Sequence, residues 1–244
     1  MIRDYGLAGI IIFMITHRAV ITELVQINRE NCVRLETRNL SDPRPGQFLR
    51  AYGIDGDELL PTLLFPCDDK GLFCGDIPGH WLPGCEIHLR GPRGNGFHLP
   101  PLAKKIALMT FDAIGVNRLL PLAGQALSTG GEVTLLSNLP LDDLAPEVEL
   151  LSMDELNPIL KWADYLAAAL VPESIDHVNQ ILASGYNRSR ALQVEVMLHT
   201  PMVCDENSAC GVCGISTTHG WKLACKDGPV FDLDELCGAE KAHA

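Results

Sequence analysis

The segment CDENSACGVCGISTTHGWKLACKDGPVF, residues 204–231, contains four of the nine cysteines of this 244-residue chain. They follow the spacing C-x5-C-x2-C, and the fourth cysteine comes after eleven further residues. The four are Cys204, Cys210, Cys213 and Cys225. A C-x2-C pair lets two thiolates reach one metal centre from a single turn, and adjacent glycines let backbone N–H groups approach the sulfurs. We therefore predict that these four cysteines bind metal.

The spacing of the four cysteines also indicates which metal centre is expected. Three close cysteines and one distant cysteine are typical of plant-type [2Fe-2S] sites. Structural zinc usually takes two separated close pairs, so here His219 would have to complete a set with three of the cysteines. The pattern favours an iron–sulfur cluster, and zinc or free thiols are the alternatives.

Charged and aromatic residues surround the last of these cysteines. Lys222 and Lys226 lie on either side of Cys225, and Trp221 precedes them. They fit the tuning and shielding of a negatively charged cluster. A solvated turn beside a core tryptophan explains the same residues equally well.

The remaining cysteines are dispersed, and we expect them to be small buried apolar residues rather than ligands. Among them are Cys32, Cys67, Cys74 and Cys85. The apolar run at residues 7–15 is too short to span a bilayer and has no cleavage site after it. We predict a buried first strand there, or an extension upstream of a later start at Met14. The chain is predicted to be cytoplasmic, without a membrane span and without a disulfide framework.

Composition excludes several functions. The formal charge of −12, the pI near 5.0 and only 19 dispersed Lys and Arg residues argue against a nucleic-acid surface. The sequence has no G-x-S-x-G, Walker or H-E-x-x-H motif, and its eight histidines are scattered. We predict no catalytic side chain.

The chain changes its periodicity twice along its length. Short alternating runs with turn signals predict an antiparallel β-barrel in residues 1–101. A continuous apolar run at 104–112, a helical pattern at 115–131 and a second run at 132–138 predict an α/β domain over residues 102–200. Further strands are expected at 148–152, 164–170 and 192–198, and a helix at 172–185. Residues 201–244 are expected to form a loop-rich, cysteine-rich tail.

Two motifs in this order resemble one protein family. CGVC at 210–213 with WKLACKDGPVFDLDEL at 221–236, and LPGCEIHLRGPRGNGFHLP at 82–100, are similar to segments of the electron-transfer subunit of type-B dihydroorotate dehydrogenase. The resemblance extends from about residue 16 to residue 236 and implies a ferredoxin-reductase-like architecture. It implies a flavin barrel, a pyridine-nucleotide domain and a [2Fe-2S] tail that pass electrons from NADH through FAD to a catalytic subunit carrying FMN. The four cysteines of the tail fall on the family's ligand positions, with one residue more between the first two.

The nucleotide motifs of the family are changed in this chain. Its Arg-Pro-x-Ser flavin motif corresponds to Leu60, Pro61, Thr62 and Leu63, and a leucine cannot bond a phosphate. The Gly-Thr pair that follows in the family is matched most nearly by Gly79 and His80. Where the family has a glycine-rich nucleotide turn, this chain has TFDAIG at 110–115, and where the family has a Cys-Gly-Pro-Glu turn, this chain has LVPE at 170–173. FAD is thus left open, and independent oxidation of NADH is not expected.

These observations predict an electron-transfer subunit with a [2Fe-2S] cluster that relays electrons between a donor and a partner flavoprotein, in a hetero-oligomer of pyrimidine biosynthesis. One alternative keeps FAD as a working cofactor. The other is a non-redox interaction or regulatory subunit whose tail binds zinc or nothing.

Overall fold

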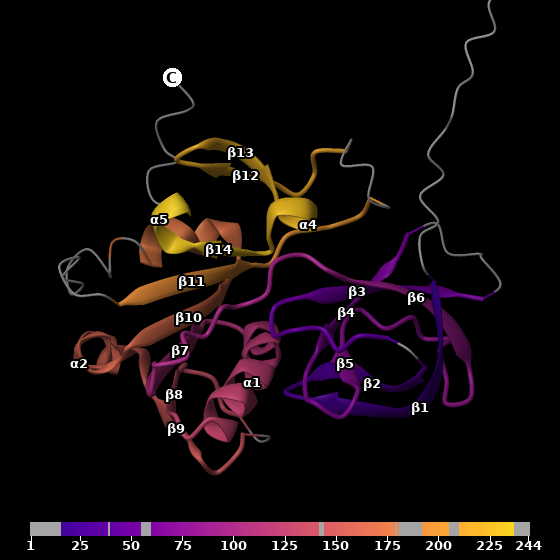
Figure 1. Ribbon diagram of the computed structural model, residues 1–244, viewed down its shortest axis with the longest axis horizontal. Helices are drawn as coiled ribbons and strands as arrows, with labels where there is room; N and C mark the ends of the chain where they lie inside the picture. Colours follow the sequence, from indigo (N-terminus) through magenta and orange to yellow (C-terminus); the bar gives the residue numbers. More distant parts are fainter. Residues whose placement is uncertain are drawn as a thin grey trace, which may run out of the picture.

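The structure is a computed structural model, and it describes residues 16–38, 40–54, 60–141, 144–178, 180, 192–204 and 210–236. Figure 1 shows a barrel beside a sheet, with the end of the chain packed on the sheet. The expected strand at residues 7–15 and, of the expected helix at 172–185, residues 179 and 181–185 lie outside the described residues. Within them, no helix is long and apolar enough to cross a bilayer.

A closed six-stranded barrel forms the first part of the chain. Its strands pair in the order β1-β2-β5-β4-β3-β6, all antiparallel. Side chains that alternate between the two faces of each strand fill its interior. The strands are β1 (His17–Ile27), β2 (Glu30–Thr37), β3 (Phe48–Gly53), β4 (Thr62–Pro66), β5 (Leu72–Cys74) and β6 (Glu86–Arg93).

A six-stranded sheet follows, with the order β14-β11-β10-β7-β8-β9. All its pairs are parallel except the pair of β14 with β11. The central strand β10 is buried along its whole length, as expected of a parallel strand that is covered on both faces. The elements are β7 (Lys105–Thr110), α1 (Ala113–Ser128), β8 (Glu132–Leu136), β9 (Val148–Leu151), the 3-10 helix η1 (Met153–Glu155), α2 (Leu156–Trp162), β10 (Tyr165–Leu170), the 3-10 helix η2 (Pro172–Ser174) and β11 (Gln193–Leu198).

The last part of the chain is more regular than its loop-like sequence suggested. It forms a hairpin of β12 (Gly214–Thr217) and β13 (Gly220–Leu223), then α4 (Ala224–Asp227), β14 (Val230–Asp232) and α5 (Leu233–Leu236). Because β14 belongs to the sheet, the tail is a structural part of the α/β layer. A barrel followed by an α/β sheet confirms the predicted fold class, while the proposed boundaries at residues 101 and 200 stay a prediction.

A buried polar cluster joins the barrel to α1. Glu30, at the start of β2, accepts hydrogen bonds from both terminal nitrogens of Arg118, at 2.6 and 3.2 Å. Asn117 donates to Glu30 and to the carbonyl of Ile27. The Arg118 guanidinium also lies 4.3 Å from the centre of the Phe65 ring. These contacts fix the angle between the two parts and thereby define the cleft between them.

Candidate functional site

The β12–β13 hairpin brings two of the predicted ligands together. Its register pairs Gly214 with Leu223, and the N–H of Ala224 donates to the carbonyl of Cys213 at 3.0 Å. Cys213 and Cys225 therefore meet at the base of the hairpin, although eleven residues separate them in sequence. Both are buried, with 2% and 8% of their surface exposed.

Cys204 lies next to this pair. Burial, together with hydrogen bonds and like charge from the neighbouring Cys213 and Cys204 thiols, raises the pKa of the Cys225 thiol to about 12. Adjacent thiols are donors that a metal centre binds as thiolates, because binding removes their protons. The donor set thus fits an iron–sulfur cluster.

Cys210 is placed differently from the other three. It is exposed at the start of the turn that passes through Gly211, whose φ of +69° favours glycine. In the part of the chain that the structure describes, no three of these four sulfurs lie within 4.8 Å of one another. The Cys225 thiol thus has Cys204 and Cys213 as neighbours, and Cys210 lies at the surface.

The GPRGNG segment holds the tail in position. The side-chain amide of Asn95 donates to the carbonyl of Asp227 at 2.7 Å, and the Asn95 N–H donates to the carbonyl of Gly228 at 2.6 Å. A Cβ at Gly94 would lie 2.6 Å from that same Gly228 oxygen, so only glycine fits there. The sequence indicated only a connecting turn at this segment. In the structure this segment binds the residues directly after Cys225.

The residues around the cysteines correct one expectation. Trp221 is 65% exposed, so it is not a core residue, and nearby Val212 is 54% exposed. Lys222 forms an ion pair with Glu235 at 2.6 Å, which engages its charge away from the thiols. An exposed aromatic ring and an exposed valine beside a ligand turn are typical of a contact surface.

A cleft of about 700 Å³ lies between the barrel and α1. Leu60 and Thr62 line it on the barrel side, and Arg118 on the helix side. Met202 and Val203 also line it, so a group bound there would lie next to the segment that leads into Cys204. Leu60 is 56% exposed where the resemblance implied an arginine, and Arg118 is already paired with Glu30. The cleft has the place and size for a flavin, but Glu30 and Arg118 in its lining are paired with each other.

The first turn of α1 is capped by its own sequence. The Asp112 carboxylate accepts a hydrogen bond from the N–H of Gly115 at 2.6 Å. In nucleotide-binding folds these N–H groups face a pyrophosphate. A carboxylate in that place repels a phosphate, and that this chain does not oxidise NADH by itself stays a prediction.

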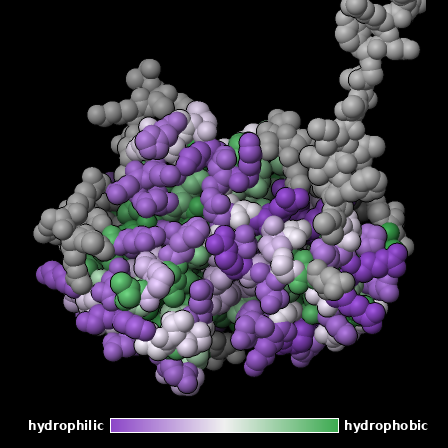
Figure 2. Space-filling model, in the orientation of Figure 1, coloured by the Kyte–Doolittle hydropathy of each residue, from purple (hydrophilic) through white to green (hydrophobic). Residues whose placement is uncertain are grey.

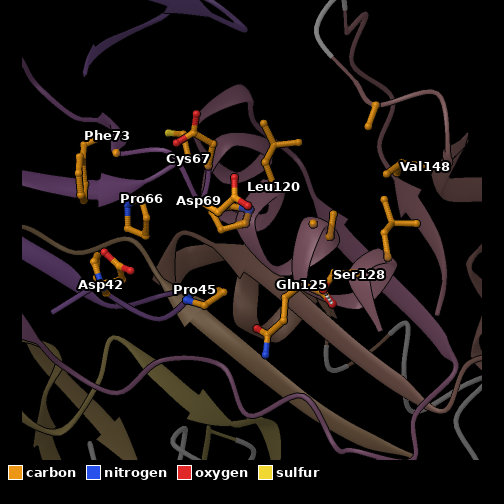
Figure 3. Close-up of a pocket in the computed structure, with 18 residues that line it drawn as sticks. Asp42, Pro45, Pro66, Cys67, Asp69, Phe73, Leu120, Gln125, Ser128 and Val148 are labelled. Atoms are coloured by element: carbon orange, nitrogen blue, oxygen red, sulfur yellow. Dashed lines mark hydrogen bonds between the residues drawn. The ribbon is translucent and has the colours of Figure 1, made fainter. Parts of the chain in front are cut away.

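A second cavity, of about 530 Å³, lies between the β4–β5 loop and the second half of α1 (Figure 3). Cys67 lies on its rim, with Asp69 beside it and Leu120 opposite. The sequence indicated dispersed cysteines without disulfides, and the second part of this expectation is wrong for three of them, because the structure pairs the Cys74 sulfur with those of Cys32 and Cys67. Cys67, Cys32 and Cys74 are buried as expected, but their sulfurs gather at one point. Strand pairing between distant segments brings them together, and no sequence spacing signals it.

Comparison with known proteins agrees with this geometry. Residues 202–237 match the family described as the iron-sulfur cluster binding domain of dihydroorotate dehydrogenase B. The electron transfer subunit of dihydroorotate dehydrogenase B from Clostridium acetobutylicum is 27% identical over 83% of this chain and 90% of its own length. This chain is similar to those electron transfer subunits over most of its length. The probable subunit of the same kind from Methanopyrus kandleri is 28% identical over 93% of this chain and 95% of its own length.

Solved structures support the fold. The NADH-dependent reduced ferredoxin-NADP oxidoreductase matches with a TM-score of 0.66 and 20% identity, over 89% of this chain and 88% of its own. Phthalate dioxygenase reductase matches with a TM-score of 0.54 and 14% identity, over 79% and 70%. The architecture is therefore that of the ferredoxin reductases, as the resemblance implied.

Proposed function

We propose that the chain is an electron-transfer subunit that exchanges electrons with a partner flavoprotein through a [2Fe-2S] cluster in its tail. The observation that carries the proposal is the adjacency of the Cys204, Cys213 and Cys225 thiols in a segment that matches an iron–sulfur cluster binding domain. The relatives are named as electron transfer subunits of dihydroorotate dehydrogenase B. The partner proposed is therefore a catalytic subunit of that kind, in a cytoplasmic hetero-oligomer of pyrimidine biosynthesis.

The roles of the side chains follow from their places. The thiolates of Cys204, Cys210, Cys213 and Cys225 would hold the two irons. When bound, the cluster supplies one-electron transfer. Burial of Cys213 and Cys225 excludes water from one side, while exposed Cys210 marks the side that a partner approaches. No side chain moves a proton; the protein sets the distance and the potential.

A flavin in the same subunit is the second candidate, favoured by the cleft of about 700 Å³ that adjoins the cluster segment. The two candidates differ in a simple measurement. A flavin absorption band survives iron chelation, whereas the absorption of a cluster does not.

The first experiment is anaerobic purification of the full chain with its co-expressed neighbours, followed by iron, sulfide, zinc and flavin quantification. About two irons and two sulfides per chain are expected. Cys225→Ser should lose most of this iron, while Cys85→Ser, a free cysteine outside the tail, should retain it. Zinc in place of iron in the tail, or a tail without metal, would overturn the proposal and favour a non-redox interaction or regulatory subunit.

A further inference from the structure

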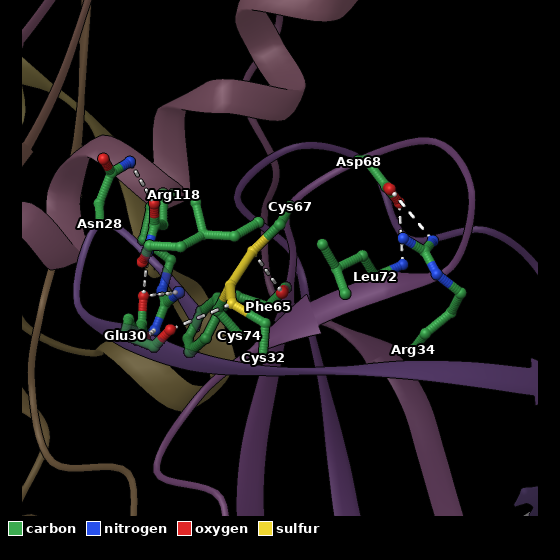
Figure 4. The surroundings of a disulfide bond; sticks show 12 residues. Asn28, Glu30, Cys32, Arg34, Phe65, Cys67, Asp68, Leu72, Cys74 and Arg118 are labelled. Atoms are coloured by element: carbon green, nitrogen blue, oxygen red, sulfur yellow. Dashed lines mark hydrogen bonds and ion pairs between the residues drawn. A yellow bond between two sulfur atoms is a disulfide. The ribbon is translucent and has the colours of Figure 1, made fainter. Parts of the chain in front are cut away.

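The barrel contains a second group of thiols that the electron relay does not use. The Sγ atoms of Cys32, Cys67 and Cys74 all lie within 4.8 Å of one another (Figure 4). Cys32 comes from β2, Cys74 from β5, and Cys67 directly follows β4. We propose that these three cysteines bind one thiophilic metal ion, Zn²⁺ or Cu⁺.

Strand register positions two of the ligands. In the β2–β5 pair, Cys32 lies directly opposite Cys74, and their Cα atoms are 4.0 Å apart. Directly paired residues of antiparallel strands point to the same face of the sheet, so both thiols project to one side. This relation is fixed by backbone hydrogen bonds rather than by flexible side chains.

A built turn positions the third ligand. The N–H of Cys67 donates to the carbonyl of Leu72 at 2.8 Å, which closes the β4–β5 loop. The Asp68 carboxylate accepts from the N–H groups of Lys70 and Leu72, both at 2.8 Å, and Arg34 of β2 donates to its second oxygen at 3.3 Å. Such side-chain-to-backbone bonds hold a turn in one conformation. The Cys67 thiol is thus held against Cys74, at a Cα separation of 6.3 Å.

A single disulfide does not account for all three cysteines. The structure records the sulfur of Cys74 in disulfide contact with both Cys32 and Cys67 (Figure 4). One sulfur forms one disulfide, so any disulfide leaves a third thiol unused in the same place. A metal ion satisfies all three together, and thiolates are the ligands that select Zn²⁺ and Cu⁺.

The surroundings suit a closed metal site with one path of access. Cys32 and Cys74 are fully buried and Cys67 is 6% exposed, with Leu72 packed against them. Binding as three thiolates releases three protons and leaves a net charge of −1 with Zn²⁺ or −2 with Cu⁺. The cavity of about 530 Å³ at Cys67 gives an entry route, and space for the fourth ligand that zinc takes.

The test is metal analysis of the full chain, purified under reducing conditions and titrated separately with Zn²⁺ and Cu⁺ against chromophoric chelators. One ion per chain in addition to the iron is expected. Of Zn²⁺ and Cu⁺, the ion that binds more tightly in its titration is the ion of the site. Cys32→Ser, Cys67→Ser and Cys74→Ser should each weaken binding at least 10-fold, because each removes a ligand. Cys85→Ser is the matched control and should bind as the unaltered chain does. The iron content of the tail should be the same in all four variants, so this result is independent of the electron-relay proposal.

A second measurement needs no variant and so does not depend on folding of the serine proteins. Bound metal should protect Cys32, Cys67 and Cys74 from alkylation, as mapped by peptide mass spectrometry, and should leave Cys85 reactive. The proposal is overturned if the reduced chain holds neither ion, or if added metal leaves the alkylation of the three cysteines unchanged. Equal loss of binding in Cys85→Ser would overturn it as well.

Discussion

Removal of the Glu30 carboxylate should destabilise the protein more than removal of any surface carboxylate. In Glu30→Ala, Arg118 would lose both hydrogen bonds to its guanidinium at a side chain only 6% exposed. Burial already lowers the Arg118 pKa, and the Glu30 charge is the main opposing influence. An uncompensated buried charge costs about 3–5 kcal/mol of unfolding free energy. Asn117 would lose a bond to the same carboxylate, which adds to the effect.

The measurement is urea unfolding followed by far-UV circular dichroism. Glu86→Ala is the matched control, because Glu86 pairs with Arg18 at 3.9 Å on the surface, where the side chains are 49% and 76% exposed. Such a pair contributes about 0–1 kcal/mol. A double variant, Glu30→Leu with Arg118→Met, should recover much of the loss, since apolar groups can replace a buried ion pair. If Glu30→Ala unfolds as late as Glu86→Ala, the argument that this cluster holds the two parts together is refuted.

Three further outcomes are expected. Gly115→Ala should lose about 1–3 kcal/mol of unfolding free energy, because its Cβ would overlap the preceding strand. Gly124→Ala lies in the same helix but its Cβ meets open space, so this variant should gain up to about 1 kcal/mol. Equal effects of the two substitutions in thermal melts would contradict this. Asn95→Ala removes the side-chain hydrogen bond to the tail and should speed the loss of cluster absorbance under air. An unchanged rate would contradict the proposal that Asn95 holds the tail in position. In metal-free protein at pH 8, iodoacetamide should modify exposed Cys210 before Cys225, because the raised pKa of Cys225, about 12, keeps its thiol protonated until the pH approaches that value. Mass spectrometry gives the order of modification. The reverse order would contradict the exposure of Cys210 and the burial of Cys225.

Local patterns were sufficient for the main elements of the fold. The run YLAAAL is uninterrupted and apolar, which predicts a strand buried on both faces, and β10 is such a strand. The helix α1 was also expected from its periodicity and its terminal glycines. In contrast, β14 is only three residues long and directly follows Pro229, so no periodicity could reveal it. It is a strand because β11 offers a free edge to pair with.

The candidate sites also divide into features with a local sequence signal and features that depend on long-range pairing. The C-x2-C spacing of Cys210 and Cys213 is a local signal, and it pointed to the tail. The gathering of Cys32 and Cys74 depends on a register between strands 42 residues apart, which sequence spacing does not encode. The contact of Asn95 with the tail spans 132 residues and was missed for the same reason. Long-range pairing, rather than residue type, therefore limits what can be read from this sequence.

The pairing of β14 with β11 has a consequence for the history of the chain. The strand that follows the fourth tail cysteine covers an edge of the sheet with antiparallel hydrogen bonds. A deletion of the tail would expose the backbone groups of β11, and unprotected edges recruit other chains into aggregates. Selection against aggregation would thus retain the cysteine segment even in a lineage that had stopped using its metal. The tail therefore has a role in the fold that does not depend on its metal, because the strand that covers β11 is separate from the cysteines.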